Sequence, residues 1–123
     1  MSNTESFRTK KELVDAVKLW KDDADQATAR YGHISQWNTT QITDMSFLFN
    51  NFMPFNEDIS NWDVSNVTNM RGMFRYCIRF NRPLNNWNVS KVIDMSEMFK
   101  SCVNFNQPLN NWNVSSVINI YRS

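Results

Sequence analysis

The sequence predicts an α/β fold: a solenoid of short parallel strands and short helices, closed at its N-terminal end by a helical cap. Tryptophan recurs every 25 residues, at Trp37, Trp62, Trp87 and Trp112, and the residues around each one repeat in phase. Residues 1–33 lack this pattern and read as helix instead. A fixed period of roughly 20 to 50 residues indicates units that stack to bury their apolar faces. We therefore expect each period to form one coil.

Residues 1–33 are expected to form the cap. Thr9 and Glu12 make a T-x-x-E capping box, which marks the start of a helix. Apolar residues then follow at helical spacing, namely Leu13, Val17, Trp20, Ala24 and Ala27. The predicted helix runs from about Lys10 to Lys21, with a further turn or two before Gly32. Its position suits it to cover the open first coil.

Each coil is expected to contain one strand and one helix. In "LNNWNVS" the apolar residues Leu84, Trp87 and Val89 fit the L-x-x-L-x-L strand signature of leucine-rich repeats. In "VIDMSEMFKSC" the apolar residues stand at i, i+3, i+4 and i+7, which is the spacing of one helical face. Residues 34–123 would then form three full coils and one partial coil, in one domain with the cap.

The repeat unit W-x-V-S-x-V-T-x-M-x-x-M-F-x-x-C-x-x-F-N, best preserved from Trp62 to Asn81, resembles that of the BspA-like surface proteins, a leucine-rich-repeat-like family. The resemblance covers residues 34–123 and implies binding or structural roles rather than chemistry. The asparagine that usually follows the strand in leucine-rich repeats is replaced by Val67, Val92 and Val117. Horseshoe curvature is therefore not implied.

The charge balance and the apolar content of the sequence bear on which partners the protein can bind. Thirteen Lys and Arg residues nearly cancel twelve Asp and Glu residues, so the chain lacks the strong field that draws proteins to nucleic acid. No apolar run approaches the roughly 18 residues of a membrane span, and no signal peptide is evident at the N-terminus. We expect an intracellular or virion-associated protein, or a cell-surface location if the chain is a fragment of a secreted protein.

The residue types that usually carry chemistry are few. Cys77 and Cys102 hold the same place in neighbouring coils, and we expect both to be buried and free. His33, the only histidine, has no nucleophile or acid in a recognisable relation to it. Sequons at Asn38, Asn66, Asn88 and Asn113 mostly reflect copying of the repeat. We predict no enzyme activity, catalytic residue, cofactor or metal site.

Candidate partner-binding residues fall into two groups. Arg71, Arg75, Arg79 and nearby Arg82 interrupt the otherwise uniform surface. Arginine there suits an acidic protein patch or a phosphate backbone, although a solvated face needs no function. The second group, Trp112, Val117, Ile120 and Tyr121, belongs to the incomplete last coil.

The incomplete coil leads to the functional hypothesis. An array normally needs a polar cap at each end, and none is evident after Tyr121. We expect another protein subunit or a second copy of the chain to cover this end. The chain would then be a non-catalytic structural or interaction component of an assembly, at a virion or a cell surface. The alternative is an adhesin-like module of a bacterial surface protein that binds host protein or glycan.

Overall fold

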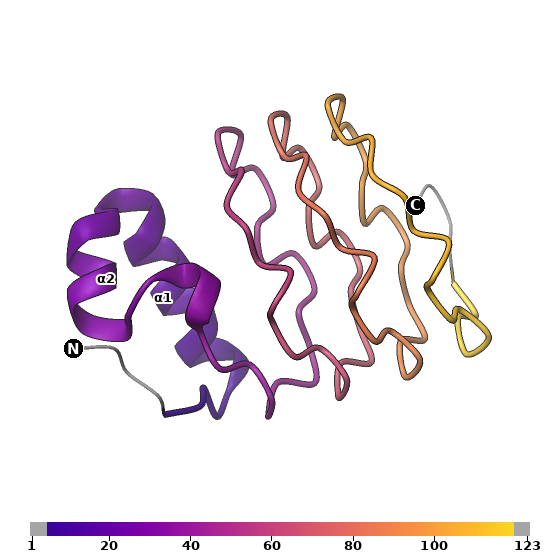
Figure 1. Ribbon diagram of the computed structural model, residues 1–123, viewed down its shortest axis with the longest axis horizontal. Helices are drawn as coiled ribbons and strands as arrows, with labels where there is room; N and C mark the ends of the chain where they lie inside the picture. Colours follow the sequence, from indigo (N-terminus) through magenta and orange to yellow (C-terminus); the bar gives the residue numbers. More distant parts are fainter. Residues whose placement is uncertain (1–4, 120–123) are drawn as a thin grey trace.

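The computed structural model describes residues 5–119 and shows two helices followed by a stack of windings (Figure 1). The helices are α1 (Lys10–Asp22) and α2 (Ala24–Tyr31), and the short 3-10 helix η1 (Ile34–Gln36) leads into the stack. Within residues 5–119 there is no strand and no further helix. Each winding spans one 25-residue repeat, since single parallel bridges join Asp44 to Asn69, Asn69 to Asp94 and Asp94 to Asn119.

The helical part begins where the capping box predicts. The Glu12 N–H donates to Thr9 Oγ1 at 3.2 Å, which satisfies one of the unpaired amides at the start of α1. One face of α1 is buried through Leu13, Ala16, Val17 and Trp20. Asp23 ends α1 and caps α2, accepting from the Gln26 N–H at 3.0 Å. The two helices therefore pack as a unit against the first winding.

Two kinds of contact join α1 to the stack. Lys10 Nζ lies 3.3 Å from Asp44 Oδ1 and 2.6 Å from Ser46 Oγ, both in the first winding. Trp20 meets Trp37 edge to face, with ring centroids 6.1 Å apart. The helical part thus covers the N-terminal end of the stack (Figure 1).

The predicted strands are wrong, and hydrogen bonds within each winding explain why. The stretch expected to be extended contains turns: the Trp87 N–H donates to the Leu84 carbonyl, and the Val92 N–H to the Val89 carbonyl, both at 3.0 Å. A chain that turns back every three residues cannot extend into a ladder. Only isolated bridges remain, so the molecule is not an α/β solenoid with a parallel sheet.

The predicted repeat helices are also wrong, because two positions in each repeat are left-handed. Phe47, Gly72 and Glu97 have φ of 57°, 59° and 59°. Asn51, Tyr76 and Ser101 have φ of 66°, 61° and 61°. A left-handed residue ends a right-handed helix, so the apolar i, i+3, i+4, i+7 spacing here belongs to a chain of turns. Their amides bond between windings instead, as when the Gly72 N–H donates to the Ser96 carbonyl at 2.9 Å.

The core consists of columns of like residues, one residue from each winding. Phe49, Phe74 and Phe99 stack with centroids 5.6 Å apart, and Phe55, Phe80 and Phe105 form a second column at 5.6 and 5.8 Å. The two columns touch within each winding, as between Phe74 and Phe80 at 4.4 Å. Residues at the same position of each 25-residue repeat therefore pack directly against one another in neighbouring windings.

Candidate functional site

The last described winding exposes part of the apolar core at the C-terminal end of the stack. We call this surface the end face, formed by Phe99, Phe105, Leu109, Trp112, Val114 and Val117. All of them except Val114 are partly buried. Val114 is 49% exposed, whereas its counterparts Val64 and Val89 are 2% and 1% exposed inside the stack. The end face is thus the same surface that neighbouring windings bury against each other.

Two of the residues predicted to bind a partner lie on the end face. Trp112 and Val117 are there, whereas Ile120 and Tyr121 fall outside the described residues. Sequence reasoning did not single out Phe99, Phe105, Leu109 or Val114. The repeat contained the signal, because the column of Phe49, Phe74 and Phe99 ends at a residue that no further described winding covers.

The arginines do not line up as one helical face, since the segment that carries them is not helical. Left-handed Tyr76 separates Arg75 from Arg79. Arg75 is half-buried, lies over the Tyr76 ring at 4.5 Å and is 3.4 Å from Asn50 Oδ1. Arg82 Nε donates to the Asn56 carbonyl at 2.9 Å. Arg71 and Arg79 are exposed. Two of the four guanidinium groups are therefore engaged within the stack.

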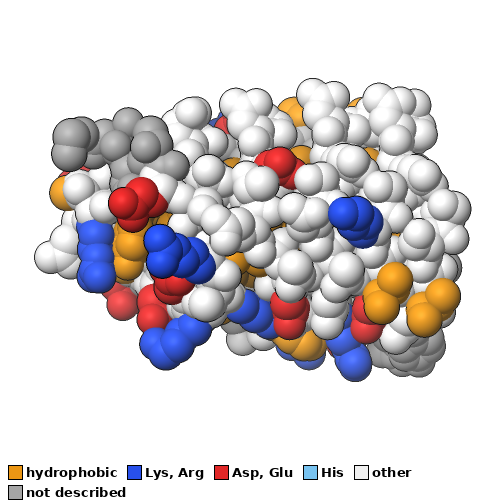
Figure 2. Space-filling view, turned by 90° about the horizontal axis from the view of Figure 1, so that it is seen from below, with side chains coloured by type: hydrophobic (Ala, Val, Ile, Leu, Met, Phe, Trp, Pro, Cys, Tyr) orange, Lys and Arg blue, Asp and Glu red, His pale blue; other side chains and the backbone are white. Residues whose placement is uncertain are grey.

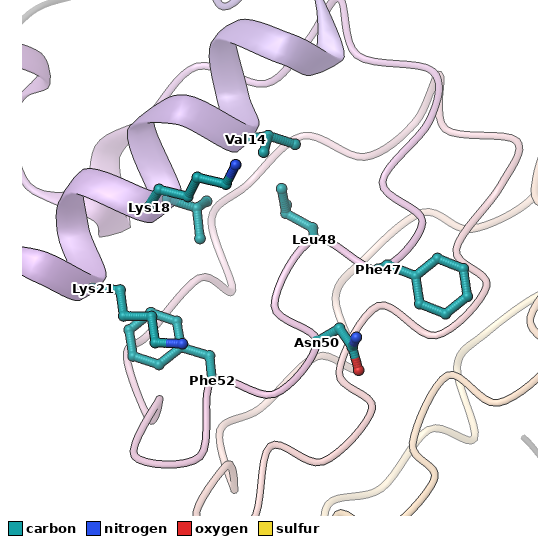
Figure 3. A pocket seen from close by; sticks show the side chains of 8 residues that line it. Val14, Lys18, Lys21, Phe47, Leu48, Asn50 and Phe52 are labelled. Carbon is teal, nitrogen blue, oxygen red and sulfur yellow. The ribbon is translucent and has the colours of Figure 1, made fainter.

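A small hollow lies between α1 and the first winding (Figure 3). Lys18 and Lys21 reach over it from α1, and its floor includes Leu48 and Phe52. Lys21 Nζ stands 5.6 Å from the centre of the Phe52 ring. Its volume of about 200 Å³ is below the roughly 300 to 1,000 Å³ of typical small-molecule sites. We assign no ligand to it.

Seen from below, the surface over the stack is mostly white, which marks backbone and uncharged polar side chains, with scattered charged and hydrophobic groups (Figure 2). A tight Asx turn recurs at the same position in each repeat. Asn38, Asp63, Asn88 and Asn113 each accept the backbone N–H of the residue two positions later, at 3.0 to 3.1 Å for the asparagines and 2.9 Å for Asp63. Three of the four sequon asparagines therefore act as local caps.

The two cysteines are free and buried, as the sequence predicts. The Cys77 thiol lies 3.0 Å from the Phe49 carbonyl, and the Cys102 thiol 2.7 Å from the Phe74 carbonyl. Burial raises the pKa of the Cys77 thiol, and it raises the pKa of the Cys102 thiol to about 11. Both thiols are therefore protonated hydrogen-bond donors at neutral pH.

Residues 5–119 offer few side chains for metal binding or acid–base chemistry. No three His, Cys, Asp or Glu side chains there lie close enough to hold a metal ion. His33 packs against the edge of Trp20 and pairs with Ser35 through Nδ1 at 2.7 Å. In the same part of the chain, no helix is both long enough and apolar enough to cross a membrane.

The sequence was compared with known proteins. The model of a family described as "Mycoplasma protein of unknown function, DUF285" matches residues 21–123. The searches of curated proteins and of solved structures found no significant match. The match covers the whole stack and the end of the helical part, so the chain belongs to the DUF285 family.

Proposed function

We propose that this chain is a non-catalytic component of a larger protein assembly, and that it works by binding another polypeptide through the end face. The observation that carries the proposal is the exposure of Val114 at 49%, where the matching valines inside the stack are buried. Apolar side chains that stay partly exposed together at the end of a stack are typical of a protein contact. The BspA-like repeat pattern supports an assembly at a cell or virion surface.

The adhesin-like alternative places binding elsewhere, on the repeated Asx turns. These turns offer amides and hydroxyls at the same place in successive windings. Amide and hydroxyl groups suit a glycan or a polar protein surface. The two proposals differ in which variants should abolish binding.

The end-face proposal is tested by sedimentation and light scattering over a wide range of protein concentration. Wild type is expected to self-associate at high concentration because its apolar end face is exposed. Val114→Glu places a charge on that face and should reduce the association without unfolding the chain, since Val114 is 49% exposed. Met53→Glu is the matched control, because Met53 is 56% exposed but lies in the first winding. An equal effect of both variants, or none, would contradict the proposal.

A further inference from the structure

Neighbouring windings are joined by hydrogen bonds that recur at every step. The indole N–H of Trp62 donates to the Ile34 carbonyl at 2.8 Å, that of Trp87 to Ile59 at 3.0 Å, and that of Trp112 to Leu84 at 2.8 Å. The carbonyls of Ile34, Ile59 and Leu84 also accept a backbone N–H within their own winding. Each of these carbonyls therefore has both lone pairs occupied.

Two further columns repeat in the same direction. The thiols of Cys77 and Cys102 reach the carbonyls of Phe49 and Phe74 in the preceding winding. The backbone N–H of Asn81 donates to Asn56 Oδ1, and that of Asn106 to Asn81 Oδ1, both at 2.9 Å. These bonds form a ladder of exposed asparagines along the stack. In all three columns the preceding winding supplies the acceptor and the following winding the donor.

The end face carries the next acceptor of each column. Within residues 5–119 the Leu109 carbonyl accepts only the Trp112 backbone N–H, and the Phe99 carbonyl only the Cys102 N–H. Asn106 Oδ1 is the third acceptor in the series. These three groups stand where their counterparts receive an indole, a thiol and an amide from the following winding. In the same winding, the Phe99 ring packs against the rings of Phe105 and Trp112, as the matching rings do inside the stack.

We propose that the end face is a docking site for one more winding of this same repeat. This inference rests on the proposed function and names the partner that it requires. The partner would place a tryptophan indole N–H on the Leu109 carbonyl, a cysteine thiol on the Phe99 carbonyl and a backbone amide on Asn106 Oδ1. Its own phenylalanines would extend the two phenylalanine columns.

A second copy of this chain is poorly suited to supply that winding. At its N-terminal end, α1 and α2 lie over the stack, so no first winding is open there (Figure 1). Two end faces brought together would bury apolar surface, but neither would present the opposite side of a winding, which forms the second half of every interior contact. Copies of the chain should therefore associate with one another more weakly than the chain does with a free winding of the repeat.

The test is a titration of the full chain, labelled with ¹⁵N, with a synthetic peptide of residues 95–119 under reducing conditions. Chemical shifts should change in the last winding of the labelled chain and not in α1. The peptide with Trp112→Phe lacks the indole donor, so its dissociation constant should rise about 2- to 10-fold, the effect of one hydrogen bond. A scrambled peptide should not bind. On the protein side, Val114→Glu should abolish binding and Met53→Glu should retain it.

The outcomes separate this inference from the function on which it rests. No binding by the peptide, or equal binding by the scrambled peptide, overturns the inference. If Val114→Glu nevertheless suppresses self-association of the chain, the end face is still an interaction surface and the proposed function stands. If the peptide fails and Val114→Glu also leaves association unchanged, both are wrong.

Discussion

Left-handed residues recur at two positions of the repeat. Gly72 occupies one of them, and both its backbone conformation and the space around it favour glycine. At Gly72, φ is 59°, and a Cβ built there would lie 2.3 Å from the Phe47 ring of the preceding winding. Phe47 and Glu97 adopt the same backbone with side chains, so the fold tolerates a side chain at this position at a conformational cost.

Gly72→Ala should therefore destabilise the protein by about 1 to 3 kcal/mol, from the left-handed backbone and the displaced Phe47 ring. Urea unfolding measures the change. Ser101→Gly is the matched control, since Ser101 is exposed with φ of 61°, and it should be neutral or stabilising by up to about 1 kcal/mol. Equal destabilisation by both variants would mean that these positions are not left-handed.

Phe74 and Phe99 hold the same place in the repeat but differ in how completely they are covered. Phe74 is fully buried between Phe49 and Phe99, whereas Phe99 lies at the end face and is partly buried. Phe74→Ala should cost about 3 to 5 kcal/mol in unfolding free energy, and Phe99→Ala roughly half as much. Chemical denaturation of both variants tests this order. A larger loss for Phe99→Ala would show that its end of the stack is covered.

At the scale of the element, the repeat predicted which residues are buried but not the backbone that buries them. Every 25 residues the same apolar side chain points inward, so the columns follow from the period alone. The period did not predict the backbone conformation. Met95, Met98 and Phe99 have the spacing of a helical face, but the left-handed residue Glu97 lies between them and prevents a helix. Only glycine or asparagine normally signals such a residue, and Gly72 was the sole glycine in the three repeats.

Part of the candidate site was also predictable from the sequence. Trp112 and Val117 follow from the position of the last winding in the sequence. The arginines seemed to share a face only because a helix was assumed, and Tyr76 in a left-handed conformation removes that face. The acceptors at Leu109 and Phe99 are backbone carbonyls, whose orientation depends on turn geometry that side-chain patterns do not encode.

One of the four Asx turns, at Asp63, makes the stability of the fold depend on pH. The Ser65 hydroxyl and N–H both donate to the carboxylate of Asp63 and hold its pKa below the ordinary value of 3.8. A carboxyl group whose pKa is lower in the folded state stabilises the fold above its unfolded pKa. That contribution is lost as pH falls through the lower, folded pKa. Stability should therefore decline below about pH 4.

Asp63→Asn should make this acid loss smaller while leaving stability near neutral pH almost unchanged. Asn38, Asn88 and Asn113 show that an amide oxygen accepts the same N–H. Asn88→Asp is the reverse variant and should add acid sensitivity. Urea unfolding at neutral pH and at about pH 2.5 measures both. The effect is modest because Asp63 is exposed. If the two variants respond to acid like wild type, the turn carboxylate does not contribute.

At the scale of the whole molecule, residues 5–119 form a stack whose two ends differ. At the N-terminal end, α1 covers the first winding through Lys10 and Trp20. At the other end, the last described winding presents the acceptors and rings that interior windings use against each other. In a stack whose units contact only their neighbours, stability adds up from one interface to the next. An end face that repeats the interior contact should therefore accept one more winding in register.

Tandem duplication of residues 95–119, placed directly after Asn119, is the most direct test, measured by urea unfolding of the extended and the original chains. The added winding should bury Phe99, Phe105 and Trp112 and place a new indole on the Leu109 carbonyl. Unfolding free energy should rise by a few kcal/mol, and the denaturant m-value by about one fifth, in proportion to 25 residues added to 123. An unchanged free energy and m-value would mean that the added segment stays unfolded, and that the end face does not match the contact between windings.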